Sequence, residues 1–61
     1  MRHVICVNLR DTKPDQLEEG KEYMVDLESL FGDEDGDWYV VVYEIDGTRI
    51  GRLKLSHFKD K

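Results

Sequence analysis

The sequence predicts a small all-β domain in which five short strands close into one strongly bent barrel. The apolar residues of the 61-residue chain fall in short runs with a two-residue alternation, and turn clusters rich in Asp and Gly separate the runs. Five strands joined by turns are too few for an ordinary two-sheet sandwich, whereas barrel closure would remove most exposed edges. Residues 1–61 are therefore expected to form a single domain.

The first strand is expected over residues 3–9, which are rich in apolar and β-branched residues. Ile5, Val7 and Leu9 alternate and would share the core face. Cys6 then lies on the opposite side, either as a partly exposed thiol or as a buried structural residue, which is the more common case for Cys.

A loop and a second strand follow. Charged and turn-forming residues around Pro14 predict the loop over 11–16, and Gly20 can adopt the positive φ that a tight turn requires. The second strand is expected over 22–28, with a core face formed by Tyr23, Val25 and Leu27.

A helix over residues 17–31 is the alternative, because several apolar residues there fall loosely at helical spacing and Glu is a good helix former. Gly20 lies inside that segment, and no N-cap with a matching apolar stripe precedes it. Both observations favour the strand. Leu30 and Phe31 are then expected to end the strand or to pack beneath the next loop.

The strongest strand pattern covers residues 38–45 and follows an acidic turn over 33–37. The Asp46-Gly47 pair that comes next is the preferred sequence for a two-residue type I′ hairpin turn. The core face of this third strand is expected to consist of Tyr39, Val41, Tyr43 and Ile45.

The return strand is expected over residues 48–55, with Gly51 interrupting its alternation. A bulge or kink at Gly51 would place Ile50 and Leu53 together on the core side. The chain is expected to finish with a one-turn 3-10 segment over 55–58 and a short last strand over 59–61.

The composition excludes several classes of protein. The longest apolar run has six residues, far fewer than the roughly 20 of a membrane-spanning helix, and the first residues carry no secretory signal pattern. A single Cys cannot form an internal disulfide and suits a reducing cytoplasm. No nucleophile elbow, phosphate loop or dinucleotide-binding glycine pattern is present. We therefore expect a cytoplasmic, non-enzymatic domain without a cofactor or membrane contact.

Charge is distributed unevenly along the chain. Residues 11–46 carry 13 acids and only two Lys, within a chain whose net charge is −5. This acidic middle disfavours non-specific binding to nucleic acid. The C-terminal segment is basic, and a nucleic-acid-binding barrel therefore remains an alternative. Basic residues of this kind are also typical of solvated strands. The residues are Arg49, Arg52, Lys54, Lys59 and Lys61. An acidic mimic of nucleic acid, which would inhibit a host protein, is a further alternative.

Two groups of residues have some features of metal sites, but neither predicts one. The acids at 33, 35, 37 and 44 match part of a calcium-loop spacing, yet Trp38 occupies the position where the sharp turn requires Gly. His3, Cys6 and His57 could meet in space but show no fixed ligand spacing. No metal is expected.

The order of these features resembles a Src-homology-3-type barrel over about residues 4–60. Residues 17–23 (Leu-Glu-Glu-Gly-Lys-Glu-Tyr) are similar to its diverging turn, and residues 35–39 (Asp-Gly-Asp-Trp-Tyr) to its acidic loop and aromatic pair. Asp46-Gly47 is similar to its distal hairpin, and residues 51–58 to its glycine, apolar residue and 3-10 turn. The resemblance implies a fold more than a function.

The chain also resembles small uncharacterised barrel proteins of Gram-positive bacteria and their phages. These carry an N-terminal Val-x-Cys-like strand and a Gly-Lys-x-Tyr-x-Val segment, which correspond here to residues 4–6 and 20–25.

Peptide-binding Src-homology-3 domains hold proline-rich ligands on an aromatic groove. Trp38 matches the groove tryptophan, whereas Lys54 replaces the groove proline and His57 replaces a groove tyrosine. The resemblance implies that Asp11, Asp15 and Glu18 stand for the loop acids that pair with a basic ligand residue. Because the first strand offers no aromatic residue, a proline-rich ligand is not favoured.

One apolar strand face remains unexplained. If Tyr39, Val41 and Tyr43 point into the barrel, then Trp38, Val40 and Val42 point away from it. Either other segments cover that face, or it is an exposed strip suited to a protein partner or a homodimer. The sequence thus predicts a protein-binding module whose candidate site residues are Trp38, His57, Asp11, Asp15, Glu18, Val40 and Val42.

Overall fold

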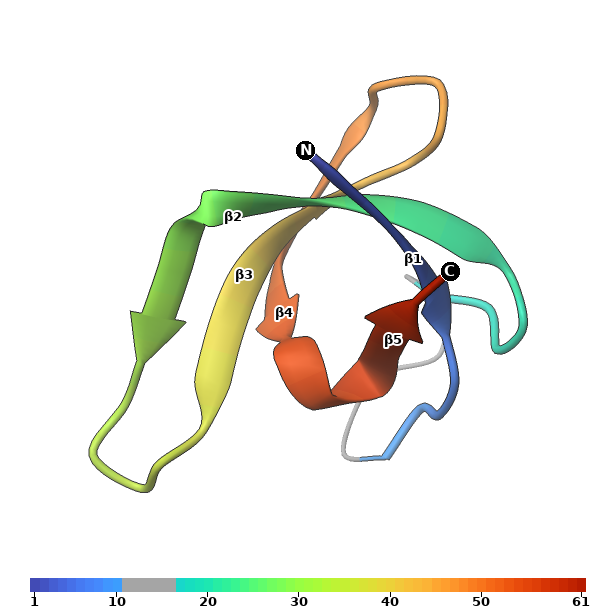
Figure 1. The fold of residues 1–61 in the computed structure, drawn as a ribbon. Helices are drawn as coiled ribbons and strands as arrows, with labels where there is room; N and C mark the ends of the chain where they lie inside the picture. The colour runs from blue at the N-terminus through green and yellow to red at the C-terminus, as the bar shows by residue number, and fades with distance from the viewer. Residues whose placement is uncertain (11–16) are drawn as a thin grey trace.

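The computed structural model, which describes residues 1–10 and 17–61, contains five antiparallel strands and one 3-10 turn (Figure 1). The elements in chain order are β1 (Arg2–Cys6), β2 (Glu22–Gly32), β3 (Trp38–Tyr43), β4 (Arg49–Lys54), η1 (Leu55–His57) and β5 (Phe58–Asp60). The all-β class and the 3-10 turn near the C-terminus are confirmed. The alternative helix over 17–31 is wrong, because β2 occupies most of that segment. The described residues contain no helix long and apolar enough to cross a membrane.

All five strands belong to one sheet with the order β4-β3-β2-β1-β5, and every neighbouring pair is antiparallel. The central strand β2 pairs with β1 only as far as Val25, which lies opposite Arg2, and pairs with β3 on its other edge. Strands β4 and β5 are the two edges in this order, and η1 connects them (Figure 1).

The core lies on the concave side of the bent sheet. Within the core, the Tyr23 and Phe58 rings meet edge to face, with 6.0 Å between their centroids. Leu9, Ile50, Leu53 and Leu55 pack against the core from its margin. Its buried residues come from four strands and the segment before β2: Val4, Cys6, Leu17, Tyr23, Val25, Val40, Val42 and Phe58.

The face of β1 that packs into the core is not the face that the sequence predicts. Val4 and Cys6 are buried, Ile5 is half-buried and Val7 is exposed. The strand also ends at Cys6, before the predicted limit at Leu9. Apolar residues occupy both faces of this segment, so alternation alone does not choose between them; pairing with β2 puts Val4 opposite the buried Tyr23.

The third strand shows the same reversal. Val40 and Val42 are fully buried, whereas the predicted core residues Tyr39 and Tyr43 are only half-buried. Val41 is also buried. Of the three residues on this second apolar face, Val40 and Val42 are covered and Trp38 is exposed. The alternative of an exposed strip is therefore wrong for the two valines.

Both β-hairpins of the described chain close with a three-residue loop. After β3, the Glu44 N–H donates to the Thr48 carbonyl at 2.8 Å and the Gly47 N–H donates to the Glu44 carbonyl at 2.9 Å. Gly47 has a φ of 97°, as expected for a type I turn followed by a glycine bulge. The predicted two-residue type I′ turn is wrong. Ile45, predicted as a core residue, lies exposed in this loop.

The predicted bulge in β4 is confirmed. Its register against β3 shifts between Val42 and Tyr43, where Val42 lies opposite Gly51 and Tyr43 opposite Arg49. The extra residue is Ile50, and Gly51 has a φ of 149°. The shift places Ile50 and Leu53 against the core, as the sequence predicts.

Strand β2 bends sharply in its second half. Its register against β3 jumps between Asp26, opposite Val41, and Phe31, opposite Tyr39. Ser29 fills the gap in the ladder: its hydroxyl accepts the Val41 N–H at 2.9 Å and donates to the Asp26 carbonyl at 2.6 Å. Figure 1 shows the part of β2 beyond this bend extending with β3 away from β1 and β5.

Candidate functional site

The extended part of the β2–β3 hairpin, residues 27–38, is called the arm below. Seven large hydrophobic residues are exposed in the described chain, and four of them lie on the arm. These four are Leu27, Leu30, Phe31 and Trp38. A concentration of exposed apolar side chains on one short segment is typical of an interaction surface.

Trp38 is held on the arm by the residue opposite it. Trp38 pairs with Gly32 across the β2–β3 ladder, and a Cβ atom at Gly32 would lie only 3.0 Å from the indole ring. The indole therefore rests where a side chain at position 32 would stand. Although Trp38 is 54% exposed, one face of its ring packs on the Gly32 backbone.

Phe31 lies on the other face of the arm. It pairs with Tyr39, and directly opposed residues of an antiparallel pair share a face. The Arg52 guanidinium of β4 sits 5.7 Å from the centroid of the Phe31 ring, within range of a cation–π contact. The arm thus presents aromatic surface on both sides of its ladder.

The turn at the end of the arm is acidic and well ordered by its own hydrogen bonds. The Asp33 carboxylate accepts the N–H groups of Asp35 and Asp37 at 3.0 and 2.9 Å. Asp37 also forms an ion pair with Lys54, at 3.5 Å. Burial, together with the neighbouring Asp33 carboxylate, raises the pKa of Tyr39. No Lys or Arg occurs in the sequence from residue 22 to residue 48, so the arm itself carries negative charge without basic residues.

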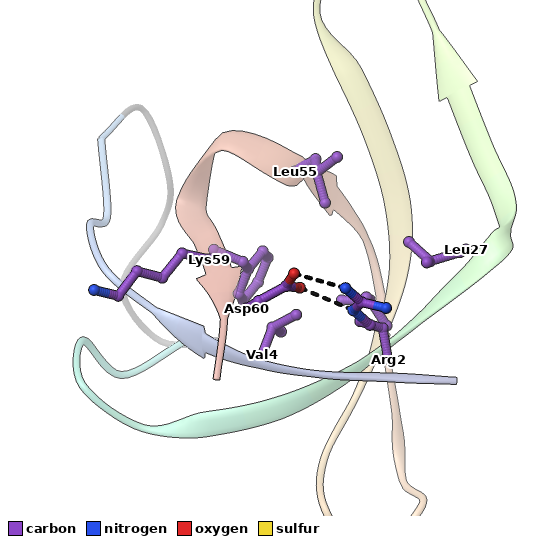
Figure 2. Close-up of a pocket in the computed structure, with 8 residues that line it drawn as sticks. Arg2, Val4, Leu27, Leu55, Lys59 and Asp60 are labelled. Atoms are coloured by element: carbon purple, nitrogen blue, oxygen red, sulfur yellow. Dashed lines mark hydrogen bonds and ion pairs between the residues drawn. The ribbon is translucent and has the colours of Figure 1, made fainter.

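An open pocket of about 370 Å³ adjoins the base of the arm (Figure 2). Its apolar wall runs from β2 across β1 to η1 and β5, and consists of Val4, Val25, Leu27, Leu55 and Phe58. Leu27 and Arg2 also line a second pocket together with Met1, Asp26 and Glu28. Leu27, a residue of the arm, therefore lines both pockets.

An ion pair borders the first pocket. The Arg2 guanidinium donates two hydrogen bonds to the Asp60 carboxylate, at 2.9 and 2.7 Å. This bidentate contact lowers the pKa of Asp60 and raises that of Arg2. Figure 2 shows the pair at the pocket and the Lys59 side chain directed away from it.

The predicted groove residue His57 does not face solvent. Its side chain is buried at 2% exposure, its Nδ1 lies 3.2 Å from the Asn8 Oδ1, and its ring contacts Phe58 edge to face. Asn8 also donates to the Ser56 carbonyl at 3.1 Å. His57 therefore joins η1 to the segment after β1, and the expectation of an exposed groove residue there is wrong.

Of the three predicted acids of the groove, the structure describes only Glu18. Asp11 and Asp15 lie outside the described residues. Glu18 is exposed in the turn before β2, where its backbone N–H donates to the Tyr23 hydroxyl at 2.8 Å. Of the predicted protein-binding residues, Trp38 and Glu18 are exposed, whereas Val40, Val42 and His57 are buried.

The basic residues of the nucleic-acid alternative are divided between two edges of the sheet. Arg49, Arg52 and Lys54 lie on β4, and three strands separate β4 from β5 in the sheet order. Lys61 forms an ion pair with Glu22 at 2.8 Å, and the same carboxylate contacts His3 at 2.7 Å. Lys59 is exposed on β5.

Of the three residues considered as scattered metal ligands, Cys6 and His57 both contact Asn8, whereas His3 contacts Glu22. The Cys6 thiol donates to the Asn8 carbonyl at 3.4 Å, and burial raises its pKa. Within residues 1–10 and 17–61, no group of three His, Cys, Asp or Glu side chains is placed to hold a metal ion.

Sequence reasoning identified Trp38 but missed Leu27, Leu30 and Phe31. Leu27 was expected in the core, and the other two were expected to end the strand or pack beneath a loop. Four residues of β2, 27–30, lie between Asp26 and Phe31, where β3 has only Val40. This excess of three residues bends β2 and exposes Leu27, Leu30 and Phe31. Comparison of the chain with protein-family models, curated proteins and solved structures finds no match, so the fold and the arm are the basis for any functional assignment.

Proposed function

We propose that this chain is a non-enzymatic protein-interaction module of the Src-homology-3-like type, and that its partner docks on the arm at Trp38. The observation that carries the proposal is the placement of the indole, which is 54% exposed and packed on Gly32. A large aromatic side chain that is already oriented loses little conformational entropy on binding, and Trp is enriched among binding hot spots.

Three features support the Src-homology-3-like assignment. The sheet has a single continuous order, β2 bends between its pairing with β1 and its pairing with the end of β3, and a one-turn 3-10 element joins the two edge strands. A strand that bends in this way can belong to two half-sheets that face each other across one core. The buried residues of β1, β2, β3 and β5 meet in one such core.

A protein partner fits the arm better than nucleic acid. The arm combines exposed apolar side chains with acids, and acids repel a phosphate backbone. The basic residues of the nucleic-acid alternative lie on the two edge strands or directly after β5, and Lys54 and Lys61 already contact acids of this chain.

The proposal is tested by affinity capture from a lysate of the host with three versions of the tagged domain: wild type, Trp38→Ala and Ile45→Ala. Ile45 is the matched control, because it is 53% exposed at the end of the other β-hairpin. Circular dichroism and thermal unfolding verify that both variants are folded.

We expect a protein that is retained by wild type and by Ile45→Ala and that is lost with Trp38→Ala. A direct titration with that purified protein would then shift the emission of Trp38, the chain's one tryptophan. Equal capture by all three versions, or an unchanged emission during a titration that binds, would overturn the proposal.

A further inference from the structure

From the free edge and the charge of the arm, we infer that the partner contributes an extended, Lys- or Arg-rich segment that adds as a strand to the outer edge of β2 at residues 27–32. This inference rests on the proposed function, because it specifies the chemistry and the binding mode of the partner at the same arm.

The first step is the unpaired edge. Strand β1 covers β2 only from Glu22 to Val25, and on the arm β3 pairs with the opposite edge of β2 at Phe31 and Gly32. In the bend between these two pairings, the Glu28 N–H donates to the Asp26 carboxylate at 3.0 Å. No strand of the described chain pairs with residues 27–32 on their outer side. Figure 1 shows this edge of β2 facing away from the rest of the sheet. An added strand would continue along β2 from the point where β1 stops.

The second step is the contrast with the other sheet edges. Native edge strands are commonly protected by Lys or Arg, by bulges or by short length. Strand β4 carries Arg49, Arg52 and Lys54, and β5 has only three residues. The outer edge of the arm carries no Lys, Arg or Pro, and instead exposes Leu27, Leu30 and Phe31. It therefore lacks the basic residues that guard β4.

The third step is charge. The bend and the arm contain six acids and no base. The basic residues beside them are Lys54 and Arg52 of β4 and Arg2 of β1, and the Arg2 guanidinium is already bound to Asp60. The acids are Asp26, Glu28, Asp33, Glu34, Asp35 and Asp37. An incoming strand with basic side chains meets complementary charge here, whereas an acidic strand is repelled.

The fourth step is the pocket beside Leu27. Its wall of Val4, Val25, Leu55 and Phe58 accepts an apolar side chain that projects from a strand lying along residues 27–32. Side chains alternate along a strand, so apolar residues of the partner would face the concave side at every second position, with basic residues between them. The segment is thus expected to alternate between basic and apolar residues.

The test uses three synthetic peptides long enough to pair with residues 27–32. One alternates Lys with Val or Leu; the second replaces every Lys by Glu; the third keeps the Lys sequence but carries N-methyl groups on the backbone amides that would pair with β2. Binding is followed by Trp38 emission and by amide chemical shifts along the arm. Two protein variants complete the design: Glu28→Gln with Glu34→Gln in one chain, and Glu19→Gln as a control for an exposed acid outside the arm.

We expect the Lys peptide to bind, to weaken as salt rises from about 50 mM to about 500 mM, and to slow hydrogen exchange of the amides in residues 27–32. N-methylation should weaken binding by at least about tenfold, because the main-chain hydrogen bonds are lost. The double variant should weaken it about threefold to tenfold, whereas Glu19→Gln should leave it unchanged.

Equal binding of the N-methylated peptide would overturn strand addition, and equal binding of the Glu peptide would overturn the charge argument. Failure of every peptide to bind would overturn the inference as a whole. If Trp38→Ala still abolishes capture of a protein from lysate in that case, the proposed function stands and only the inferred partner chemistry is lost.

Discussion

Ser29 shows how one side chain makes the arm possible. The extra residues in β2 leave the Val41 N–H without a backbone acceptor from a regular ladder, and the Ser29 hydroxyl accepts it at 2.9 Å. Since Val41 is only 8% exposed, water is a poor substitute for that acceptor. The bend that exposes Leu27 and Phe31 thus depends on a hydroxyl at position 29.

We therefore expect Ser29→Ala to lower the free energy of unfolding by about 1–3 kcal/mol, the cost of leaving a buried donor unsatisfied. Urea denaturation measures the change. Ser56→Ala, at an exposed residue of η1, is the control and should change stability by less than about 0.5 kcal/mol. Equal effects of the two substitutions would show that the hydroxyl does not support the bend.

Cys6 provides a second test at the scale of one residue. Its side chain is fully buried, and desolvation raises the pKa of the thiol, with the Glu19 charge acting in the same direction. Because the thiolate is the reactive form, a thiol reagent should modify Cys6 only after the core opens. The labelling rate at mildly alkaline pH should rise with urea in parallel with unfolding. Rapid labelling of the native protein, at the rate of the unfolded chain, would contradict the burial of Cys6.

The role of His57 could not be predicted from the sequence. Its partner Asn8 is 49 residues away, and nothing near either residue indicates the contact. The resemblance placed His57 in a groove, whereas this pairing buries it between η1 and the segment after β1. The choice of Trp38 as a candidate site residue could be made from the sequence. Its neighbours Asp37 and Tyr39 mark the start of a strand after a turn, and side chains at the end of a ladder are commonly exposed to solvent.

At the scale of elements, the positions of the strands follow from the sequence better than their faces do. Gly and Asp mark the turns before and after β3, so its limits are nearly correct. Both alternating sets in β3 are apolar, however, and the choice of Val40 and Val42 for the core is made by pairing with β2 and β4. Likewise, Asp46-Gly47 suits two turn types, which differ by one residue in loop length.

Glycine stands on the two hairpins for two different reasons, a positive φ at Gly47 and a ring packed against Gly32, and substitutions distinguish them. Gly47 has a φ of 97° with nothing near its missing Cβ, so Gly47→Ala should cost about 1–2 kcal/mol through backbone strain alone. Gly47→Asn should cost less, since Asn tolerates this conformation better. Urea denaturation of both variants checks the order of stability, and a more stable Ala variant would contradict the turn assignment.

Gly32 differs because the Trp38 ring occupies its side-chain space, 3.0 Å from the position of a Cβ atom. Gly32→Ala should therefore move the indole and shift Trp38 emission, whereas Gly47→Ala should leave the emission unchanged. Identical spectra for wild type and Gly32→Ala would show that the ring does not rest on residue 32.

At the scale of the whole molecule, the two ends of the chain are held together. The Arg2 guanidinium and the Asp60 carboxylate are 58 positions apart in sequence and form a bidentate contact beside the pocket (Figure 2). Strands β1 and β5 are neighbours in the sheet, and Val4 lies opposite Asp60 in their register. The contact therefore links two strands that are far apart in sequence and adjacent in the sheet, a non-local pairing of the kind that forms slowly in folding.

The pH dependence of this contact can be measured by a double-mutant cycle of Arg2→Ala and Asp60→Asn. The hydrogen bonds from Arg2 lower the pKa of Asp60 below its ordinary value of 3.8. A carboxyl whose pKa is lower in the folded state contributes stability that is fully present above the unfolded value and is lost as the pH falls through the folded value. The coupling between the two substitutions should therefore be favourable at neutral pH and disappear in strong acid. A coupling that persists after Asp60 is protonated, or that is absent at neutral pH and low salt, would show that packing of β1 on β5 holds the ends together without help from the ion pair.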